Sequence, residues 1–294
     1  MLKIQKLSSA GQPQVLPLLG RCFPDYWEQV AARESRMPFD EISFAAYYDR
    51  VLCGHCGVML YEVADNNGVF QKMGGIASVA VAPEYRGRGI AAKLCQEVIS
   101  WAETAPELLS LPLYTALFRV YESVSWTPYP VPHAFFARPQ RKIAALKWQR
   151  GNELEKNVKE FIISLYESTP VYPGKIRRRN GTEFHSWRRI FADPELSFAA
   201  TACGYAIKYG DVLAETGFIP GTPAEIKKDF FAAALTPDGA DILLPETSVS
   251  GMELALSAAH SDPMHGERVL IRDVKNSEFH RKNPGLFFSL VDKF

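Results

Sequence analysis

The sequence lacks an excess of charge of either sign and any long apolar run. Lys plus Arg and Asp plus Glu number 33 each in 294 residues, so no net charge attracts nucleic acid or an anionic membrane. No stretch approaches the roughly 18 consecutive apolar residues that a membrane-spanning helix needs. The opening residues, MLKIQKLSSAGQPQ, contain no apolar signal-peptide segment. We therefore expect a cytoplasmic protein with neither nucleic acid nor a membrane as partner.

Cysteines are also few, and an odd total of five in a chain of this length argues against a disulfide framework. Cys53-Gly54-His55-Cys56 has the spacing of thiol–disulfide exchangers, but that chemistry places the first cysteine at a helix N-terminus. Apolar and aromatic residues flank this segment on both sides, which favours a packed strand. Neither the cysteines nor the six histidines follow a metal-ligand spacing, so we expect no metal.

The chain does contain ample material for a core, being 47% hydrophobic and 12% aromatic. Residues 1–7 predict a strand, residues 14–35 a helical region broken at Pro24, and residues 43–64 two strands with a turn near Asp49-Arg50. A turn at DNNG, residues 65–68, a strand over 69–83 with a weak point at Gly74-Gly75, an amphipathic helix from Gly89 and a strand over 110–117 follow. This order predicts an α/β fold.

The second half repeats this organisation. After an amphipathic helix over 151–169, Ser197 to Ala200 repeats the SFAA of residues 43–46, and each copy opens a hairpin. A strand ending near a proline and then a helix follow in both copies. We predict a duplicated architecture with domains 1–135 and 136–294, in which the second copy lacks the glycine loop of the first.

That loop lies in VAVAPEYRGRGIAAKL, residues 79–94. The first turn of a helix has unpaired N–H groups and a partial positive charge, and glycines let an anion approach the backbone. Gly87-x-Gly89-x-x-Ala92 matches a dinucleotide fingerprint. However, four residues separate the strand from the glycines, and the next strand, SLPLYT, ends without the acidic residue that this fingerprint expects. An NAD-binding Rossmann protein is thus the weakest interpretation.

Coenzyme A is the other phosphate-bearing cofactor that suits this loop. Arg86, Gly89 and Ala91 fit the pattern Arg/Gln-x-x-Gly-x-Gly/Ala, and the VAVAPEY before them is equally typical. The stretch resembles the acyl-CoA-binding signature of the GCN5-related N-acetyltransferase (GNAT) family over about residues 40–127. The resemblance implies a mixed, mostly antiparallel sheet flanked by helices, followed here by a degenerate GNAT-like lobe, with acetyl-CoA as the acyl donor.

The same resemblance implies the cofactor-binding residues. The backbone of the strand would hold the pantetheine arm at Val79, Ala80 and Val81. The loop N–H groups would hold the pyrophosphate, at Arg86, Gly87, Arg88, Gly89, Ile90 and Ala91.

The family also places a tyrosine after the following strand, and RVYESVSWTPY supplies Tyr121. A phenol beside the sulfur can protonate the departing CoA thiolate. Core packing with a hydrogen-bonded hydroxyl is the alternative role. Ser125 stands where the family usually has glycine, which bears on the turn that positions Tyr121.

The acceptor site is less defined by the sequence. The cluster CFPDYWEQ lies where the acceptor site of the family begins, and its acids and rings suit a cationic amine. An amphipathic helix with core aromatics explains the cluster equally well. The candidate substrate residues are Phe23, Asp25, Tyr26, Trp27 and Glu28.

The doubled layout resembles the multi-lobed acetyltransferases of the enhanced-intracellular-survival type. By that resemblance HGERVLIRDV, residues 265–274, belongs to the second lobe, and the sterol-carrier-like third lobe has no counterpart before Phe294. The basic segment KIRRRNG, residues 175–181, suits a solvated face or an interdomain contact better than nucleic acid.

We therefore expect an acetyl-CoA-dependent N-acetyltransferase that acts on a primary amine of a small molecule or on an exposed amino group. The alternative is a non-catalytic acyl-CoA-binding or interaction protein. The sequence leaves the general base and the oligomeric state open, a homo-oligomer included.

Overall fold

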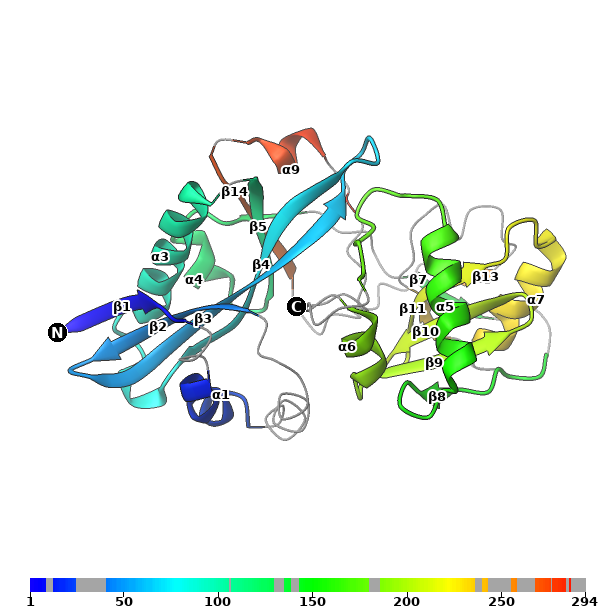
Figure 1. Cartoon of the computed structure of the whole chain (residues 1–294), viewed down its shortest axis with the longest axis horizontal. Helices are drawn as coiled ribbons and strands as arrows, with labels where there is room; N and C mark the ends of the chain where they lie inside the picture. The colour runs from blue at the N-terminus through cyan, green and yellow to red at the C-terminus, as the bar shows by residue number, and fades with distance from the viewer. Residues whose placement is uncertain are drawn as a thin grey trace.

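The computed structural model describes residues 1–8, 13–24, 41–105, 107–129, 135–138, 143–179, 186–235, 240–242, 255–257, 268–275, 277–283 and 286. These residues form two lobes, each built around its own seven-stranded sheet (Figure 1). None of the helices within these ranges has the length and apolar character needed to cross a membrane.

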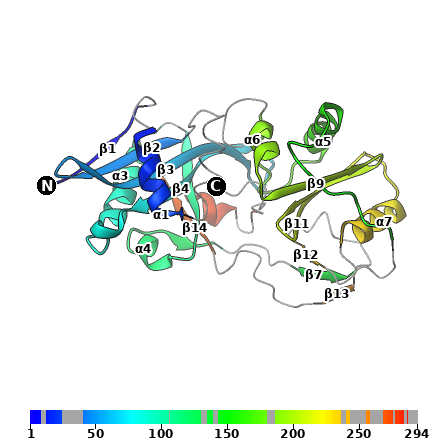
Figure 2. The same cartoon turned by 90° about the horizontal axis from the view of Figure 1, so that it is seen from below.

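The first sheet has the strand order β1-β2-β3-β4-β5-β14-β6. All neighbours are antiparallel except β4 and β5, which are parallel. Helix α1 (Leu16–Cys22) packs on one face, whereas α3 (Ile90–Thr104) and α4 (Phe118–Glu122) cover the other (Figure 2). The strands are β1 (Leu2–Lys6), β2 (Ile42–Tyr48), β3 (Val51–Ala64), β4 (Phe70–Val81), β5 (Leu108–Thr115), β6 (Thr127–Pro128) and β14 (Arg268–Asp273).

The hairpin of β3 and β4 dominates this lobe. The side chain of Asp65 accepts hydrogen bonds from the backbone N–H groups of Asn67 and Val69, both at 2.9 Å, and Gly68 has the positive φ of 76° that the turn needs. The turn predicted at DNNG is therefore confirmed. The CGHC segment lies in β3, as expected, and its two cysteines are buried and free.

The second sheet has the order β13-β7-β12-β11-β10-β9-β8. Helices α5 (Lys156–Ser168), α6 (Trp187–Ala192) and α7 (Ala224–Ala234) accompany it (Figure 2). The strands are β7 (Phe135–Arg138), β8 (Gln149–Arg150), β9 (Leu196–Thr201), β10 (Gly204–Tyr209), β11 (Val212–Phe218), β12 (Ala240–Ile242) and β13 (Ala255–Ser257).

The two sheets confirm the duplicated architecture. In each lobe an antiparallel meander (β2-β3-β4 or β9-β10-β11) leads to a helix (α3 or α7), and the strand after that helix returns parallel to the last meander strand. Both SFAA segments lie in the first strand of their meander.

One expectation about the second lobe is wrong. The strand in HGERVLIRDV is β14, which pairs with β5 through Leu270 and Leu113 and with β6 through Ile271 and Thr127, so it belongs to the first sheet. Strand β7, which follows β6 in the chain, lies instead in the second sheet beside β12. The first sheet thus contains one strand, β14, that comes after every strand of the second sheet in the sequence. The division into domains 1–135 and 136–294 stays a prediction.

A shared core joins the lobes. Tyr61, Val63 and Met73 of the β3–β4 hairpin belong to the same buried cluster as Ile162 of α5 and Trp187 of α6. Apolar burial on both sides of the junction resists separation of the lobes.

The KIRRRNG segment forms an interdomain contact, one of the two roles expected of it. Ile176 bridges to Val63 of β3, and the guanidinium of Arg178 donates to both carboxylate oxygens of Glu215 in β11, at 2.8 and 2.5 Å. Tyr205 donates to the same carboxylate at 2.8 Å. The Glu215 carboxylate therefore balances the buried charge of Arg178 and accepts two hydrogen bonds from its guanidinium.

Candidate active site

The candidate site begins where two strands of the first sheet separate. The parallel ladder between β4 and β5 runs from the Lys72–Leu108 pair to the Ile76–Leu113 pair and ends there. Strand β4 continues for five more residues, to Val81. The backbone over this stretch therefore faces the opening between the strands, and it includes Val79, Ala80 and Val81.

A bulge distorts β4 at this opening. The register between β3 and β4 shifts between His55 and Gly57, and Ser78 has a left-handed backbone with φ of 52°. A serine costs about 1 kcal/mol or more in this conformation, so surrounding contacts must hold it. The sequence suggested a weak point at Gly74-Gly75 instead, but both glycines keep regular pairing with β3.

A buried polar network holds the bulge. His55, which is fully buried, places Nδ1 2.9 Å from the Ser78 carbonyl oxygen. Because a carbonyl only accepts, Nδ1 carries the proton and donates it. The other ring nitrogen, Nε2, lies 3.1 Å from both the Glu41 carboxylate and the Ser43 hydroxyl. No local sequence pattern marks His55, because its partners lie in two other segments, residues 41–43 and strand β4.

The glycine loop follows β4. A 3₁₀ turn (Pro83–Tyr85) leads into Gly87 and Gly89, whose φ values are 74° and 71°. Both positions need glycine for this backbone, and a Cβ on either would meet no atom within 4 Å. The loop is exposed, so a ligand could approach its backbone closely.

The loop leads into helix α3, and the first backbone N–H groups of this helix are free of capping by a side chain. Gly89 is the N-cap residue, no side chain caps the helix, and no acidic residue stands in the first turn. The first intrahelical bond runs from the Lys93 N–H to the Gly89 carbonyl at 3.1 Å, so Ile90 and Ala91 have no intrahelical acceptor. A helix start of this kind binds phosphate well.

The two loop arginines are held by backbone carbonyls. Arg86 donates through Nε to Val81 at 3.1 Å, and Arg88 donates to Glu84 at 3.2 Å. The Arg88 guanidinium also lies 5.3 Å from the ring centre of Tyr85. Both arginines are exposed, and these contacts keep their charge beside the loop.

The described residues that precede α7, the corresponding helix of the second lobe, form no equivalent loop. Helix α7 begins after Pro223, which has an extended backbone, and Gly221 is the nearby residue with positive φ, at 82°. The absence predicted from GTPAEIKKDFF is therefore confirmed, and the anion-binding helix start exists in the first lobe.

Tyr121 lies on α4, just after β5. Its side chain is 8% exposed, and its ring contacts Trp126 edge-on at 6.2 Å. Burial, and then the nearby thiols of Cys95 and Cys56, raise the pKa of Tyr121 well above its usual range. The phenol therefore stays protonated at every physiological pH.

The turn after α4 keeps the backbone of a glycine although the residue is a serine. Ser125 has φ of 72°, and the following N–H, that of Trp126, donates back to the Tyr121 carbonyl at 3.1 Å. The Trp126 indole donates to the Leu111 carbonyl at 2.6 Å. The substitution thus leaves the turn in place and adds backbone strain.

The acceptor candidates are only partly visible. Phe23 caps the C-terminal end of α1 and is 38% exposed. The remaining candidates lie outside the described residues: Asp25, Tyr26, Trp27 and Glu28.

Comparison with known proteins agrees with this geometry. Residues 13–124 match the model of the acetyltransferase (GNAT) family. The match lies within the first lobe, which is therefore similar to this family of acetyltransferases. No curated protein matches the chain at a significant level.

Solved structures extend the likeness to both lobes. A conserved protein of unknown function from Enterococcus faecalis is 16% identical with a TM-score of 0.65, over 95% of this chain and 74% of that one. A GCN5-related N-acetyltransferase from Anabaena variabilis is 17% identical with a TM-score of 0.60, over 92% and 72%. Eis1 from Mycobacterium abscessus is 14% identical with a TM-score of 0.56, over 93% and 72%. At these identities the likeness establishes the two-lobed GNAT fold.

Proposed function

We propose that the protein transfers the acetyl group of acetyl-CoA to a primary amine, either of a small molecule or of an exposed amino group. The observation that carries this proposal is the exposed start of α3 at Gly89, next to the opening between β4 and β5 in a GNAT domain. An anion-binding helix start beside an open strand edge suits a ligand with both phosphates and an amide-containing arm.

Two sets of backbone groups would hold the donor. The N–H groups from Arg86 to Ala91 would bind the pyrophosphate, with the two arginines adding charge. The β4 backbone from Val79 to Val81 would pair with the amides of the pantetheine arm, as an added strand pairs with an open edge.

Tyr121 would act as the general acid. The neutral amine attacks the thioester carbonyl carbon, and the C–S bond then breaks. The electron pair leaves with sulfur, which takes the proton of the Tyr121 hydroxyl. The amine nitrogen, positively charged after the attack, loses a proton as the amide forms, and the Tyr121 phenolate would take up that proton directly or through solvent. The raised pKa of Tyr121 keeps the acid loaded before the reaction begins.

One observation favours the non-catalytic alternative, an acyl-CoA-binding protein. Tyr121 is only 8% exposed and its ring packs edge-on against Trp126, as expected of a tyrosine with a structural role. Turnover and binding must therefore be measured separately.

The donor site is tested by a matched glycine pair. Gly89→Ala and Gly221→Ala place a side chain at similar positive φ, with nothing within 4 Å in either case. Both variants should lose similar stability, but only Gly89→Ala should weaken acetyl-CoA binding measured by calorimetry. Equal acetyl-CoA affinity in the two variants would contradict the proposed donor site.

The catalytic role is tested by Tyr121→Phe against Tyr129→Phe. Tyr129 is also buried, and its hydroxyl donates to the Asn283 carbonyl at 2.5 Å, away from the opening. Tyr121→Phe should lower kcat at least 100-fold while the acetyl-CoA dissociation constant stays unchanged. Tyr129→Phe should lower stability alone. An unchanged kcat in Tyr121→Phe would assign that residue to packing.

A further inference from the structure

A cavity lies at the other end of α3 from the glycine loop. It has a volume of about 590 Å³, within the range of small-molecule sites, and it is lined by residues of both lobes. Helix α3 has 15 residues, so its two ends are about 22 Å apart. The proposed acetyl-CoA site therefore does not include this cavity.

The segment over residues 174–179 forms one wall of the cavity by extending the first sheet. Strand β2 stops pairing with β3 at Val58, and the segment continues the ladder further along β3. The Ala64 N–H donates to the Lys175 carbonyl and the Arg177 N–H donates to the Glu62 carbonyl, both at 2.9 Å. Because side chains alternate along an extended chain, Arg177 and Arg179 share one face, opposite to Arg178.

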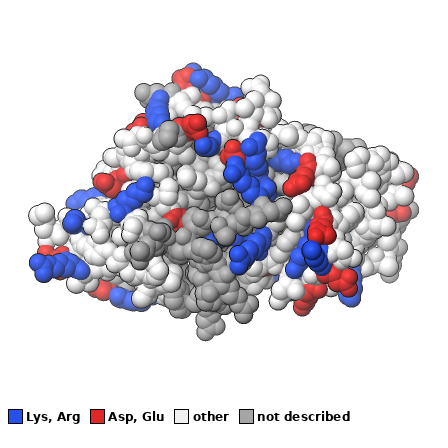
Figure 3. Space-filling view, viewed as in Figure 1, with Lys and Arg blue, Asp and Glu red and all other residues white. Residues whose placement is uncertain are grey.

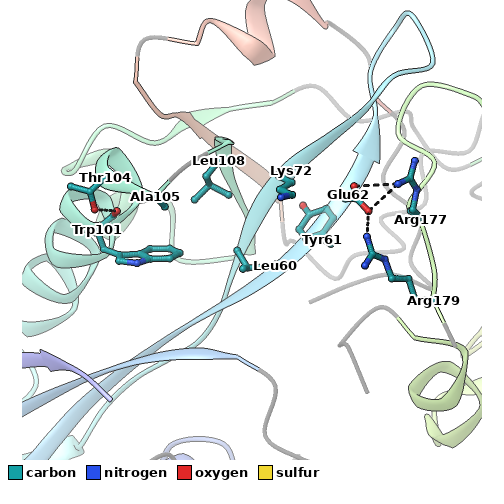
Figure 4. A pocket seen from close by; sticks show the side chains of 10 residues that line it. All are labelled: Leu60, Tyr61, Glu62, Lys72, Trp101, Thr104, Ala105, Leu108, Arg177 and Arg179. Atoms are coloured by element: carbon teal, nitrogen blue, oxygen red, sulfur yellow. Dashed lines mark hydrogen bonds and ion pairs between the residues drawn. The ribbon is translucent and has the colours of Figure 1, made fainter. Parts of the chain in front are cut away.

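The cavity is apolar at its α3 end. Leu60, Trp101 and Leu108 project into it, and Thr104 and Ala105 close it where the helix ends (Figure 4). The last-turn carbonyl of Trp101 accepts from the Thr104 hydroxyl at 2.7 Å. A helix C-terminus carries partial negative charge, so an anionic group is disfavoured at this end.

The opposite end is cationic. Arg177 and Arg179 share the carboxylate of Glu62, at 3.3 and 2.6 Å, so among these three described residues one positive charge is in excess (Figure 4). The Arg177 guanidinium lies 4.2 Å from the ring centre of Phe70, a contact that fixes its orientation. Each guanidinium has five N–H donors, far more than one carboxylate uses. Lys72 lies nearby and pairs with Glu107.

Lys and Arg side chains lie on this face of the molecule, where the β3–β4 hairpin meets the second lobe, with acidic side chains beside them (Figure 3). The attraction of an anion to this end of the cavity therefore depends on Arg177 and Arg179 themselves.

We infer that this cavity binds a small amphipathic carboxylate, with its apolar body against Leu60, Trp101 and Leu108 and its carboxylate on Arg177 and Arg179. An apolar pocket with a few convergent polar groups at one end fixes the orientation of such a ligand. A guanidinium pair matches a carboxylate through parallel N–H donors. A cationic ligand would meet the excess positive charge, and an uncharged one would leave the donors at that end unused. This inference does not depend on acetyl transfer.

The test is isothermal titration calorimetry with sodium decanoate on the full chain, without acetyl-CoA. Decanoate should bind saturably, one molecule per chain. The double variant Arg177→Gln/Arg179→Gln should weaken binding at least tenfold, and decan-1-ol should bind wild type at least tenfold more weakly than decanoate. Leu60→Ser, a change at a side chain that is 51% exposed, should also weaken binding from the apolar end.

Arg281→Gln is the matched control, because Arg281 is an exposed arginine that pairs with Glu278 outside the cavity lining, and its affinity for decanoate should equal that of wild type. Absence of saturable decanoate binding up to 1 mM would overturn the inference. So would equal decanoate affinity in wild type and the arginine double variant. Binding of inorganic phosphate, but not decanoate, that depends on both arginines would also overturn it, because the site would then take an anion without an apolar body.

Discussion

The imidazole of His55 in β3 donates a hydrogen bond to the carbonyl of Ser78 in β4, the residue whose backbone is left-handed at the bulge. Both atoms are close to the opening between β4 and β5. The contact connects the buried carboxylate of Glu41 to the strand that would hold the pantetheine arm, so the shape of the donor site depends on a network beneath it.

We predict that His55→Ala raises the KM for acetyl-CoA and lowers the free energy of unfolding by about 3 kcal/mol. The change removes the partner of a buried carboxylate and frees the bulge to relax. Urea denaturation and acetyl-CoA titrations measure the two effects. His280→Ala is the control, because His280 is 38% exposed and pairs with Asp273, and it should cost less than about 1 kcal/mol. An unchanged KM in a folded His55→Ala protein would show that the network does not shape the site.

We predict that Ser125→Gly stabilises the protein by about 1 kcal/mol, because glycine adopts a φ of 72° without a Cβ penalty. The neighbouring Ser123→Gly should do the opposite. Ser123 has an ordinary φ of −62°, and its hydroxyl donates to the Val120 carbonyl at 2.7 Å. Thermal unfolding of both variants provides the comparison. Destabilisation by Ser125→Gly would mean that its side chain contributes more than its backbone costs.

The third prediction concerns pH. Burial lowers the pKa of Lys175 to about 8, although its ammonium donates to the carbonyls of Tyr166 and Thr169 at 2.8 and 2.7 Å. The folded state therefore releases this proton more readily than the unfolded state, whose lysine titrates near 10.4. The stability contribution of Lys175 is present above the unfolded pKa and is lost as pH falls through about 8.

Consequently, the free energy of unfolding of wild type relative to Lys175→Met should rise between pH 8 and 10, by about 1–3 kcal/mol. Urea melts at closely spaced pH values measure this difference. Above pH 10 the raised pKa values of Tyr121 and Tyr205 act in the opposite direction, in wild type and variant alike. A difference that stays flat from pH 8 to 10 would contradict a lowered lysine pKa.

The fourth prediction concerns the position of β14. Leu270 is fully buried and pairs with Leu113 of β5. Leu270→Ala should cost about 2–5 kcal/mol and should raise hydrogen exchange in peptides that cover β5. Ile242→Ala, a buried change in β12, should raise exchange in the second sheet instead. If the Leu270 variant instead showed faster hydrogen exchange in β12 than in β5, the pairing of β14 with β5 would be contradicted.

The sequence predicted turns, helices and strands well, but it predicted poorly which strands and side chains pair with each other. The turn at Asp65 to Gly68, the strand that contains Cys53 and Cys56, and the helix from Gly89 all depend on neighbours within a few residues, and all three are present. The bulge at Ser78 was missed because VAVA favours a regular strand, and only a partner strand shows the shift in register. The weak point expected in the strand at Gly74-Gly75 was wrong for a related reason. A Cβ on Gly74 would meet Val58 at 2.8 Å, so close packing explains that glycine.

The assignment of β14 failed because strand pairing is set by tertiary contacts. The segment VLIRD has strong strand character, but nothing in it specifies a partner more than 150 residues earlier. For the candidate site, the loop from Arg86 to Ala91 was located from the sequence. The supporting pair of His55 and Glu41 could not be located in this way, because only the folded structure shows which groups a buried polar residue contacts.

The place of β14 in the first sheet also constrains how the chain can fold as it is made. Strand β5 ends at Thr115, and its neighbour β14 begins at Arg268, so roughly 150 residues separate the two in synthesis. At about 5–20 residues per second, the ribosome takes roughly 8–30 s to supply them. During that interval β5 has an unpaired edge, the kind of edge that pairs with other chains. The first sheet is completed only after most of the second has been synthesised, so a nascent chain stalled before residue 268 would hold a donor loop on an unfinished sheet.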